Sequence, residues 1–318
     1  MNTETRPLVS IITPVLNRQA FIGRCLMSVA KQTHPQIEHI IVDGGSTDGT
    51  LEVLRSFQKT HPVTWISGPD VGMYDAINKG MELAHGEILA YLNSDDLYLP
   101  WSVETAASAL SRRGDLCYGD MAVMAERRVG RRFFIQYYPA FDRKHFTYEG
   151  ALGQPSVFWT RSVMDKIGGF DTSYQLIGDC EYWLRAARAG MTLHHVKDVL
   201  AIQVEHGETL RTRRPERLHE EWAMLRAAYA EWAGPPRREW QERLAAGASW
   251  RANQLRFIAS AHRSKPTAWP RFLAWLKREG VDIPASGLLW FSLPGRRGGR
   301  PSLVDLPPLE RALDALAS

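Results

Sequence analysis

The sequence predicts an α/β fold in which helices flank a mostly parallel β-sheet, followed by a mainly helical C-terminal region. In the first half, short apolar runs rich in β-branched residues alternate with stretches whose apolar residues recur at helical spacing. Strands that alternate with helices form right-handed crossovers in a parallel sheet. In the last third, long helical patterns replace the strand-like runs.

The elements of the first half alternate strictly. Apolar runs that end in polar or glycine-rich turns predict buried strands at residues 7–16, 37–45, 63–67 and 87–93. Helix-spaced apolar residues predict helices at residues 18–32, 50–60, 73–86 and 101–114. Asn17 is the expected N-cap of the first helix and Gly86 the expected end of the third.

The second half has a looser pattern. The expected elements are a hairpin at 115–138, a strand at 154–159, helices at 161–171 and 179–190, strands at 191–196 and 199–204, and helices at 215–234 and 237–263. We place a domain boundary near residue 210, with a first domain at 1–210 and a helical region at 211–318.

Composition indicates a soluble globular protein, because 44% of the residues are hydrophobic and 23% are charged. The three cysteines form no Cys-x-x-Cys pair, which disfavours a disulfide framework and a zinc site. No stretch approaches the roughly 20 apolar residues of a membrane span, and the polar start is unlike a signal peptide. We therefore expect a cytoplasmic protein.

The charges are distributed unevenly along the chain. Residues 211–318 carry 19 basic and 11 acidic side chains, whereas the preceding residues carry 20 and 24. Seven of the 11 tryptophans also follow residue 210. The C-terminal region is thus basic and rich in tryptophan, which suggests a role different from that of the acidic first domain.

Carboxylates follow three successive strands of the expected sheet. Asp43 ends the second strand, Asp70 comes just after the third, and Asp95 and Asp96 follow the fourth. Ligands of such sheets bind beyond the carboxyl ends of the strands. Aspartate is also a good turn former, but that explanation weakens when all the strand ends are taken together.

Two adjacent carboxylates suit a hard divalent cation such as Mg²⁺ or Mn²⁺, which takes one or two carboxylates together with phosphates and water. The chain has no Gly-x-x-x-x-Gly-Lys-Ser/Thr loop, and its DGGSTDGT segment lacks the Gly-x-Gly-x-x-Gly spacing. P-loop and dinucleotide-binding folds are therefore disfavoured. Phosphate bound through a metal ion is the alternative.

Five segments resemble the family 2 glycosyltransferases of GT-A fold, of the type found in bacterial surface-polysaccharide synthesis. They are SIITPVLNR, IIVDGGSTDGT, GPDVGMYDAINKG, LNSDD, and the block from GQPSVFWTRSVMDKIGGFD to GDCEYWLRAARAG. The resemblance covers roughly residues 8–210 and implies a Rossmann-like GT-A fold. It also implies an inverting transfer of a sugar from a nucleotide-diphospho-sugar to a glycan or lipid-linked acceptor hydroxyl.

The resemblance implies a set of donor-binding residues. Residues 13–17 would line the pocket of the nucleotide base and Asp43 would contact the base, since a carboxylate accepts an imide N–H. The other implied positions lie near the nucleotide, its phosphates or the acceptor. The set is Thr13, Pro14, Asn17, Asp43, Asp70, Asn78, Lys79, Asp95 and Gln154.

The resemblance also implies the metal ligands and the base. Asp96 would bind Mn²⁺ or Mg²⁺, Asp95 would be shared between the metal and the ribose, and His206 is a candidate third ligand. Asp179 would be the general base that takes the acceptor proton, although a helix N-cap is the alternative role for it. The family often has Glu-Asp here, whereas Gly178 precedes Asp179 in this chain.

Alternative functions remain open on the sequence. A sugar-nucleotide nucleotidyltransferase would need a glycine-rich loop after the first strand, and TPVLNRQ has none. A processive synthase is disfavoured because its membrane spans and its Gln-x-x-Arg-Trp motif are missing. A non-catalytic adaptor of the same fold is opposed by the complete set of carboxylates.

Two interpretations of the basic C-terminal region carry equal weight. Tryptophans among arginines suit a helix on an anionic membrane surface, which would make the enzyme peripheral on the inner face of the cell membrane, near a lipid-linked acceptor of the cell envelope. Alternatively, a helical domain buries these tryptophans in its own core. Nucleic-acid binding is not expected, because no motif supports it. The residues concerned are Trp222, Trp232, Trp240, Trp250, Trp269 and Trp275, among Arg237, Arg238, Arg243, Arg251, Arg256, Arg263 and Arg271.

Overall fold

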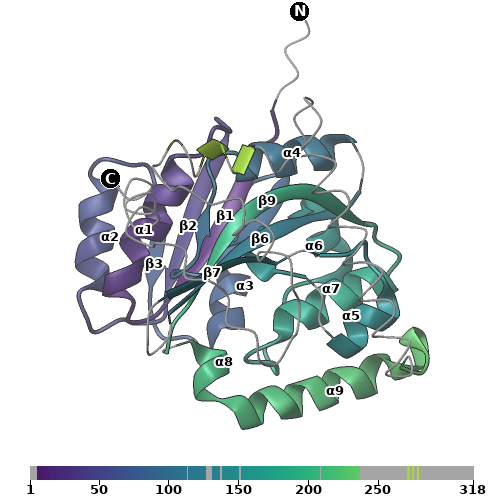
Figure 1. The fold of residues 1–318 in the computed structure, drawn as a ribbon. Helices are drawn as coiled ribbons and strands as arrows, with labels where there is room; N and C mark the ends of the chain where they lie inside the picture. The colour runs from purple at the N-terminus through teal and green to yellow at the C-terminus, as the bar shows by residue number, and fades with distance from the viewer. Residues whose placement is uncertain are drawn as a thin grey trace, which may run out of the picture.

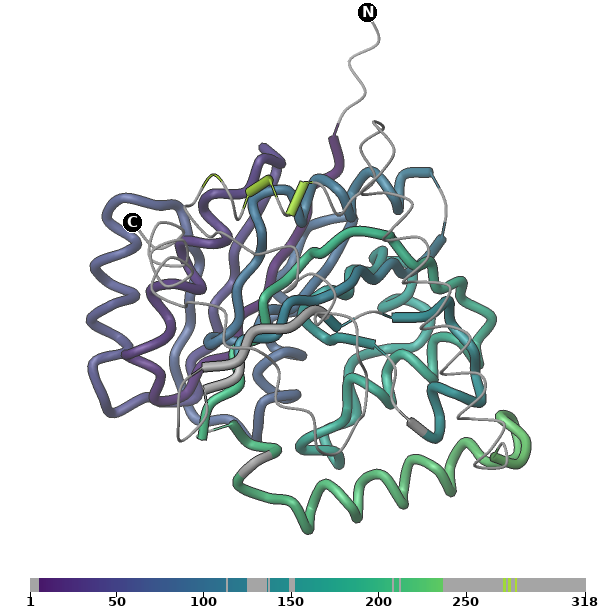
Figure 2. The backbone as a smooth tube through the Cα atoms, in the orientation of Figure 1, coloured from purple at the N-terminus to yellow at the C-terminus, as the bar shows by residue number. Residues whose placement is uncertain are grey.

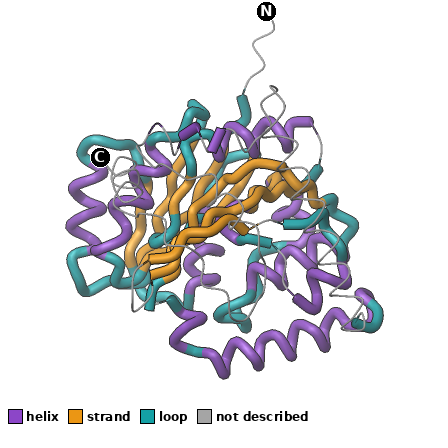
Figure 3. The backbone as a smooth tube through the Cα atoms, viewed as in Figure 1, coloured by secondary structure: helices purple, strands orange, loops and turns teal. Residues whose placement is uncertain are grey.

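Helices flank a single mixed β-sheet in the computed structural model of the chain (Figures 1 and 3). The structure describes residues 6–112, 114–126, 131–136, 138–149, 152–207 and 209–236, together with residues 271, 272, 274, 275 and 278. The helix expected at residues 237–263, and with it Trp240 and Trp250, lies outside the described residues, as does Trp269.

The strands are β1 (Val9–Val15), β2 (Ile37–Asp43), β3 (Thr64–Ser67), β4 (Ile88–Tyr91), β5 (Leu97–Tyr98), β6 (Leu116–Glu126), β7 (Arg131–Gln136), β8 (Val157–Thr160) and β9 (Leu193–Glu205). Within the described residues these nine strands form one sheet in the order β3-β2-β1-β4-β8-β6-β9-β5, and β7 pairs with β6.

The helices are α1 (Gln19–Ala30), α2 (Thr50–Gln58), α3 (Met73–Leu83), α4 (Ser102–Arg112), α5 (Arg143–Glu149), α6 (Arg161–Ile167), α7 (Gly178–Arg188), α8 (Leu210–Arg213) and α9 (Pro215–Ala233), with a short 3₁₀ helix at Gln154–Ser156. Helix α9 runs along the edge of the molecule beside α5 and α7 (Figures 1 and 2).

The first four strands of the sheet, β1 to β4, pair in parallel, as predicted. Val15 is level with Asp43, and Asp43 is level with Ser67, so the carboxyl ends of β1, β2 and β3 meet at one edge. Antiparallel pairing then joins β8 to β4 and to β6, and the predicted hairpin is β6–β7. Every residue of β1 and β4 is buried, as their apolar runs predict.

Two predicted element boundaries were wrong, and one strand was missed. The strands expected at 191–196 and 199–204 are one strand, β9, because β6 pairs with it on both sides of an irregularity at Asp120. Helix α3 ends at Leu83 rather than at Gly86, since Ala84 is already extended. The two-residue strand β5, which pairs with β9, was not predicted.

Asn17 is not the N-cap of α1, contrary to the sequence prediction. Its φ of 52° lies in the left-handed region, which asparagine tolerates better than most residues. The helix begins at Gln19, and the Asn17 side-chain oxygen instead accepts the backbone N–H groups of Thr47 and Asp48 at 2.8 and 3.3 Å. Asn17 thus joins the turn after β1 to the turn after β2.

The described tryptophans of the C-terminal region pack against the first domain. Trp275 is 3% exposed, and its ring meets Trp101 edge to face at 6.4 Å. Trp222 and Trp232 are partly buried against the same core. The domain boundary near residue 210 stays a prediction, but the chain on its two sides is in close contact.

Candidate active site

A cavity of about 910 Å³ opens at the carboxyl ends of β1 and β4. Its lining includes the segment after β1, the loop before α3, the turn after β4, the approach to α7, and the chain between β9 and α9. The sequence-predicted site residues among the lining residues are Pro14, Asp70, Asp95, Asp96, Gln154, Asp179 and His206. The structure thus brings carboxylates from three separate parts of the sequence to one cavity.

Asp96 is the buried member of the carboxylate pair, with 3% of its surface exposed. One oxygen accepts the Val204 backbone N–H at 3.0 Å and the other accepts the Asn93 amide at 3.5 Å. Burial, followed by the neighbouring charge of Asp95, raises the pKa of Asp96 well above its ordinary value. A cation at this position would offset that unfavourable charge.

His206 lies beside the pair, as the sequence predicted for a third ligand. Its Nε2 is 3.0 Å from Asp95 Oδ2, and its ring stacks on Phe21 with centroids 4.5 Å apart. Asn93 Oδ1 is buried without a hydrogen-bond partner among the described residues. These residues fit Mg²⁺ or Mn²⁺ held by one or two carboxylates and completed by phosphates and water.

A cage made by the protein alone is not present in the part of the chain that the structure describes, where no group of three or more His, Cys, Asp or Glu residues has metal-binding geometry. A site of two carboxylates therefore needs ligands from elsewhere. Nucleotide phosphates are the ligands that Mg²⁺ usually adds to such a site.

Asp179 lies at the start of α7 and is 2% exposed, although it lines the cavity. The Tyr74 hydroxyl donates to Asp179 Oδ1 at 3.2 Å and accepts the Asp179 backbone N–H at 3.2 Å. Burial, and next the charge of Asp179, raise the pKa of Tyr74, so its hydroxyl stays protonated. Asp179 Oδ2 faces the Arg211 guanidinium at 3.6 Å.

Sequence reasoning missed Tyr74 and Arg211 as partners of Asp179. Tyr74 belongs to α3 and Arg211 to α8, which are 105 and 32 residues away from Asp179 in the sequence. Tyr74 lies inside the GPDVGMYDAINKG segment, so the family motif marked the region without indicating its contact. Arg211 lies just past the resembling region, and no pattern in the sequence singles it out.

The packing around α7 explains why residue 178 is a glycine. A Cβ atom at residue 178 would lie 2.7 to 2.9 Å from three ring carbons of Tyr74. Real Cβ atoms do not approach that closely, so the tyrosine ring takes the space that a larger residue before Asp179 would need. In this chain the position before Asp179 is therefore restricted to glycine by the tyrosine that contacts Asp179.

The residues predicted for the nucleotide base divide into two groups. Pro14 lines the cavity, whereas Thr13, Asn17 and Asp43 do not. The Thr13 hydroxyl is fully buried and lies 2.9 Å from His39 Nε2. Asp43 Oδ2 accepts three hydrogen bonds from residues 45, 46 and 67, but its buried Oδ1 has no partner among the described residues.

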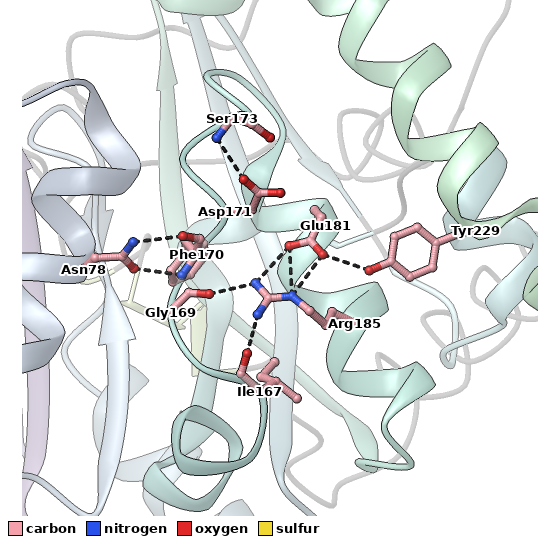
Figure 4. Close-up of polar contacts among 9 residues, drawn as sticks. All are labelled: Asn78, Ile167, Gly169, Phe170, Asp171, Ser173, Glu181, Arg185 and Tyr229. Carbon is pink, nitrogen blue, oxygen red and sulfur yellow. Dashed lines mark hydrogen bonds and ion pairs between the residues drawn. The ribbon is translucent and has the colours of Figure 1, made fainter.

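Asp70 lines the cavity, but Asn78 and Lys79 do not. The Asn78 amide bonds both the backbone N–H and the C=O of Phe170, at 2.7 and 2.8 Å (Figure 4). Lys79 pairs with Asp75 at 2.9 Å and donates to the Pro69 carbonyl at 3.1 Å. In this conformation the two side chains stabilise the protein around the cavity.

Gln154 reaches the turn that carries the carboxylate pair. Its amide N–H₂ donates to the Tyr91 carbonyl at 2.8 Å, and its oxygen accepts the Asn93 amide at 3.1 Å. Asn93 in turn donates to Asp96. Gln154 therefore helps to orient the turn after β4, in addition to lining the cavity.

The comparisons with known proteins agree with this fold. The model of "Glycosyl transferase family 2" matches residues 10–167. A PGL/p-HBAD biosynthesis glycosyltransferase of Mycobacterium bovis BCG is 30% identical over 207 residues, which are 63% of this chain and 78% of that protein. Glycosyltransferase AglE of Haloferax volcanii is 29% identical over 215 residues, 62% of this chain and 67% of that protein.

Two solved structures share the fold at low sequence identity. S. aureus TarS 1–349 in complex with UDP superposes with a TM-score of 0.54 and 19% identity, over 70% of this chain and 65% of that one. The mannosyltransferase PcManGT from Pyrobaculum calidifontis, in complex with GDP-Man and Mn²⁺, superposes with a TM-score of 0.55 and 21% identity, over 90% and 79%.

The sheet and its cavity therefore define a glycosyltransferase of GT-A fold. The chain belongs to glycosyltransferase family 2.

Proposed function

We propose that the chain is an inverting, metal-dependent glycosyltransferase, with a nucleotide-diphospho-sugar as donor and an acceptor hydroxyl on a glycan or lipid-linked saccharide. One observation carries the proposal. The candidate base Asp179 and the carboxylate pair Asp95 and Asp96 line the same cavity at the carboxyl edge of the sheet. An inverting transfer needs a base beside the acceptor hydroxyl on one face of the sugar, and a site that binds the charged diphosphate leaving group on the other face.

The donor site lies along the ends of β1, β2 and β4. Oδ1 of Asp43 has no hydrogen-bond partner among the described residues, which supports a contact with the N–H of a nucleotide base, although Asp43 does not line the cavity in this conformation. TarS is described with UDP and UDP-GlcNAc, and PcManGT with GDP-Man. We propose that the donor of this chain is a nucleotide-diphospho-sugar of the same kind as UDP-GlcNAc or GDP-Man.

The residues that would hold Mn²⁺ or Mg²⁺ are Asp95 and Asp96, with His206 as the third. PcManGT is described with Mn²⁺, which supports the choice of a divalent cation. When bound, the cation neutralises the negative charge that develops on the departing nucleotide diphosphate.

Asp179 accepts the proton of the acceptor hydroxyl. As it does so, the hydroxyl oxygen forms a bond to the anomeric carbon, and the bond from that carbon to the phosphate oxygen breaks. The Tyr74 hydroxyl keeps Asp179 Oδ1 oriented, which leaves Oδ2, on the side of Arg211, as the oxygen that takes the proton.

Peripheral binding to a membrane is part of the proposal for the acceptor side. Leu16, Val71 and Leu210 are 48%, 80% and 38% exposed, and all three line the cavity. Arg18 and Arg214 line it too. Apolar side chains beside arginines suit an anionic lipid surface. Among the described residues no helix combines the length and the apolar character needed to cross a membrane.

The test measures sugar release or transfer from UDP-GlcNAc and GDP-mannose with MnCl₂, for the wild type, Asp179→Asn and Asp96→Asn. We expect Asp179→Asn to lose at least about 100-fold in kcat, because general-base catalysis contributes about 10²–10⁴-fold. Asp96→Asn should also lose activity, because it removes a charged ligand of the cation that stabilises the departing diphosphate. Glu52→Gln is the control, since Glu52 is an exposed residue of α2 that pairs with Arg55. Wild-type activity in both aspartate variants would contradict the roles proposed for Asp96 and Asp179.

A further inference from the structure

A glutamate of α9 binds the chain immediately before the candidate base. Glu221 is fully buried, and its carboxylate accepts the backbone N–H groups of residues 175, 176 and 177 at 2.7, 2.9 and 3.1 Å. Among the described residues its ion-pair partner is Arg217, one turn earlier on α9, at 2.9 Å. Helix α9 follows the part of the chain that the family model matches.

These three N–H groups lead directly into α7. The helix begins at Gly178, its N-cap Ile177 makes no side-chain capping bond, and Asp179 is its second residue. N–H groups at a helix start have no partner within the helix and carry a partial positive charge. The Glu221 carboxylate therefore fixes the segment that leads into α7, and its last donor is the N–H of the N-cap Ile177.

A second contact joins α9 to α7 one turn further along. The Tyr229 hydroxyl donates to Glu181 Oε1 at 2.8 Å, and Glu181 pairs with Arg185 (Figure 4). Arg185 donates to the carbonyls of Ile167 and Gly169, the latter at 2.7 Å. On the other side of this loop, the amide of Asn78 binds the next residue, Phe170. Helix α7 is thus fixed between α9 and the loop before it.

We infer that Glu221, on α9, is a positioning residue for the transfer reaction. By binding the segment before α7, it sets the position of Asp179 in the cavity. This inference rests on the proposed function, in which Asp179 is the base. Residues 175 and 176 line the cavity, so the same three bonds also shape the wall beside Asp179. The three N–H groups and the Arg217 guanidinium compensate the charge of the buried Glu221 carboxylate, so this carboxylate can hold the segment before Asp179 in place.

Glu221→Gln is the sharpest substitution, because the amide keeps the size of the carboxylate. It replaces one accepting oxygen by an N–H₂ group that cannot accept, and it removes the charge that holds Arg217. Glu220→Gln is the matched control, since Glu220 also pairs with Arg217, at 3.3 Å, but its side chain is 64% exposed. Glu221→Asp keeps the charge but shortens the side chain. It is the variant to test if Glu221→Gln does not fold.

The experiment compares the wild type, Glu221→Gln, Glu220→Gln and Asp179→Asn in two measurements. The first is the kcat and donor KM with UDP-GlcNAc or GDP-mannose and MnCl₂. The second is hydrogen–deuterium exchange of the backbone amides of residues 175–177. We expect Glu221→Gln to lower kcat about tenfold, which corresponds to about 1.4 kcal/mol of transition-state stabilisation, to leave the donor KM within twofold, and to accelerate exchange. Glu220→Gln should match the wild type in all of these.

The outcomes separate this inference from the proposed function. If Asp179→Asn is inactive but Glu221→Gln keeps the wild-type kcat, Glu221 only stabilises the fold and the inference is wrong. Unchanged exchange at residues 175–177 also overturns it, because the bonds would then not hold this segment. If Asp179→Asn keeps the wild-type kcat, Asp179 is not the base, and the proposed function fails together with the inference.

Discussion

The contact between Gly178 and Tyr74 offers a direct test of how the cavity wall is built. Gly178→Ala adds one methyl group at the start of α7. That group would lie 2.7 Å from the nearest ring carbon of Tyr74. The ring has little freedom to move, because it is 2% exposed, stacks on Phe170 at 5.5 Å, and is hydrogen-bonded to Asp179 through its hydroxyl.

The expected cost follows from this confinement. Adding a methyl group to a well-packed site costs about 1–3 kcal/mol. For a protein of this size the melting temperature should fall by about 1.5 °C for each kcal/mol. A shift of Tyr74 would also displace Asp179, so under the proposed function kcat should fall more than the donor KM changes.

Gly23→Ala is the matched control, because it makes the same chemical change inside helix α1. The nearest atom to its new methyl group would be a Val53 methyl carbon at 4.0 Å. Alanine in a helix interior is favoured over glycine by up to about 1 kcal/mol, so this variant should be at least as stable as the wild type. Thermal unfolding followed by circular dichroism measures both. Equal melting temperatures for the two alanine variants would refute the close-packing argument.

Two further predictions concern pH and membranes. Burial raises the pKa of Asp198 to about 7, well above its ordinary 3.8. Between about pH 4 and about pH 7 this carboxyl is ionised in the unfolded chain but protonated in the folded protein, so the stability of the wild type should fall by about 1.4 kcal/mol per pH unit. Urea unfolding should therefore show Asp198→Asn gaining stability over the wild type across this window, and a constant difference would contradict the assignment. With phosphatidylglycerol vesicles, Val71→Asp should reduce binding about tenfold in a sedimentation assay, since burying a valine contributes about 1.5 kcal/mol. Met224→Asp, at a residue 42% exposed on α9, is the control, and equal binding of the two variants would exclude the cavity rim as the membrane contact.

Much of the fold was predictable because its signals are local. The four apolar runs of the first half predict β1 to β4, and their alternation with helices predicts the parallel pairing. The later strands were less clear. Residues 197 and 198 lie between the two strands predicted at 191–196 and 199–204, yet β9 continues through them because β6 pairs with the chain before and after them.

The candidate site was predictable in part, for a related reason. The carboxyl ends of parallel strands meet at one edge, so Asp70, Asp95 and Asp96 were expected near each other, and all three line the cavity. Asp43 and Thr13 were expected to line a base pocket, but their side chains are engaged by neighbouring strands and turns. The sequence pattern does not show which partner a buried polar group selects.

What the sequence by itself determined is the class of fold, the order of its elements, and the edge of the sheet where carboxylates gather. These follow from periodicity and from turn residues, which act over a few positions along the chain. Only the tertiary structure decided the partners of Asp179. Tyr74 and Arg211 contact Asp179, and Glu221 binds the segment just before it, from three helices distant in sequence. The packing of those helices is set by side chains whose contacts leave no periodic pattern.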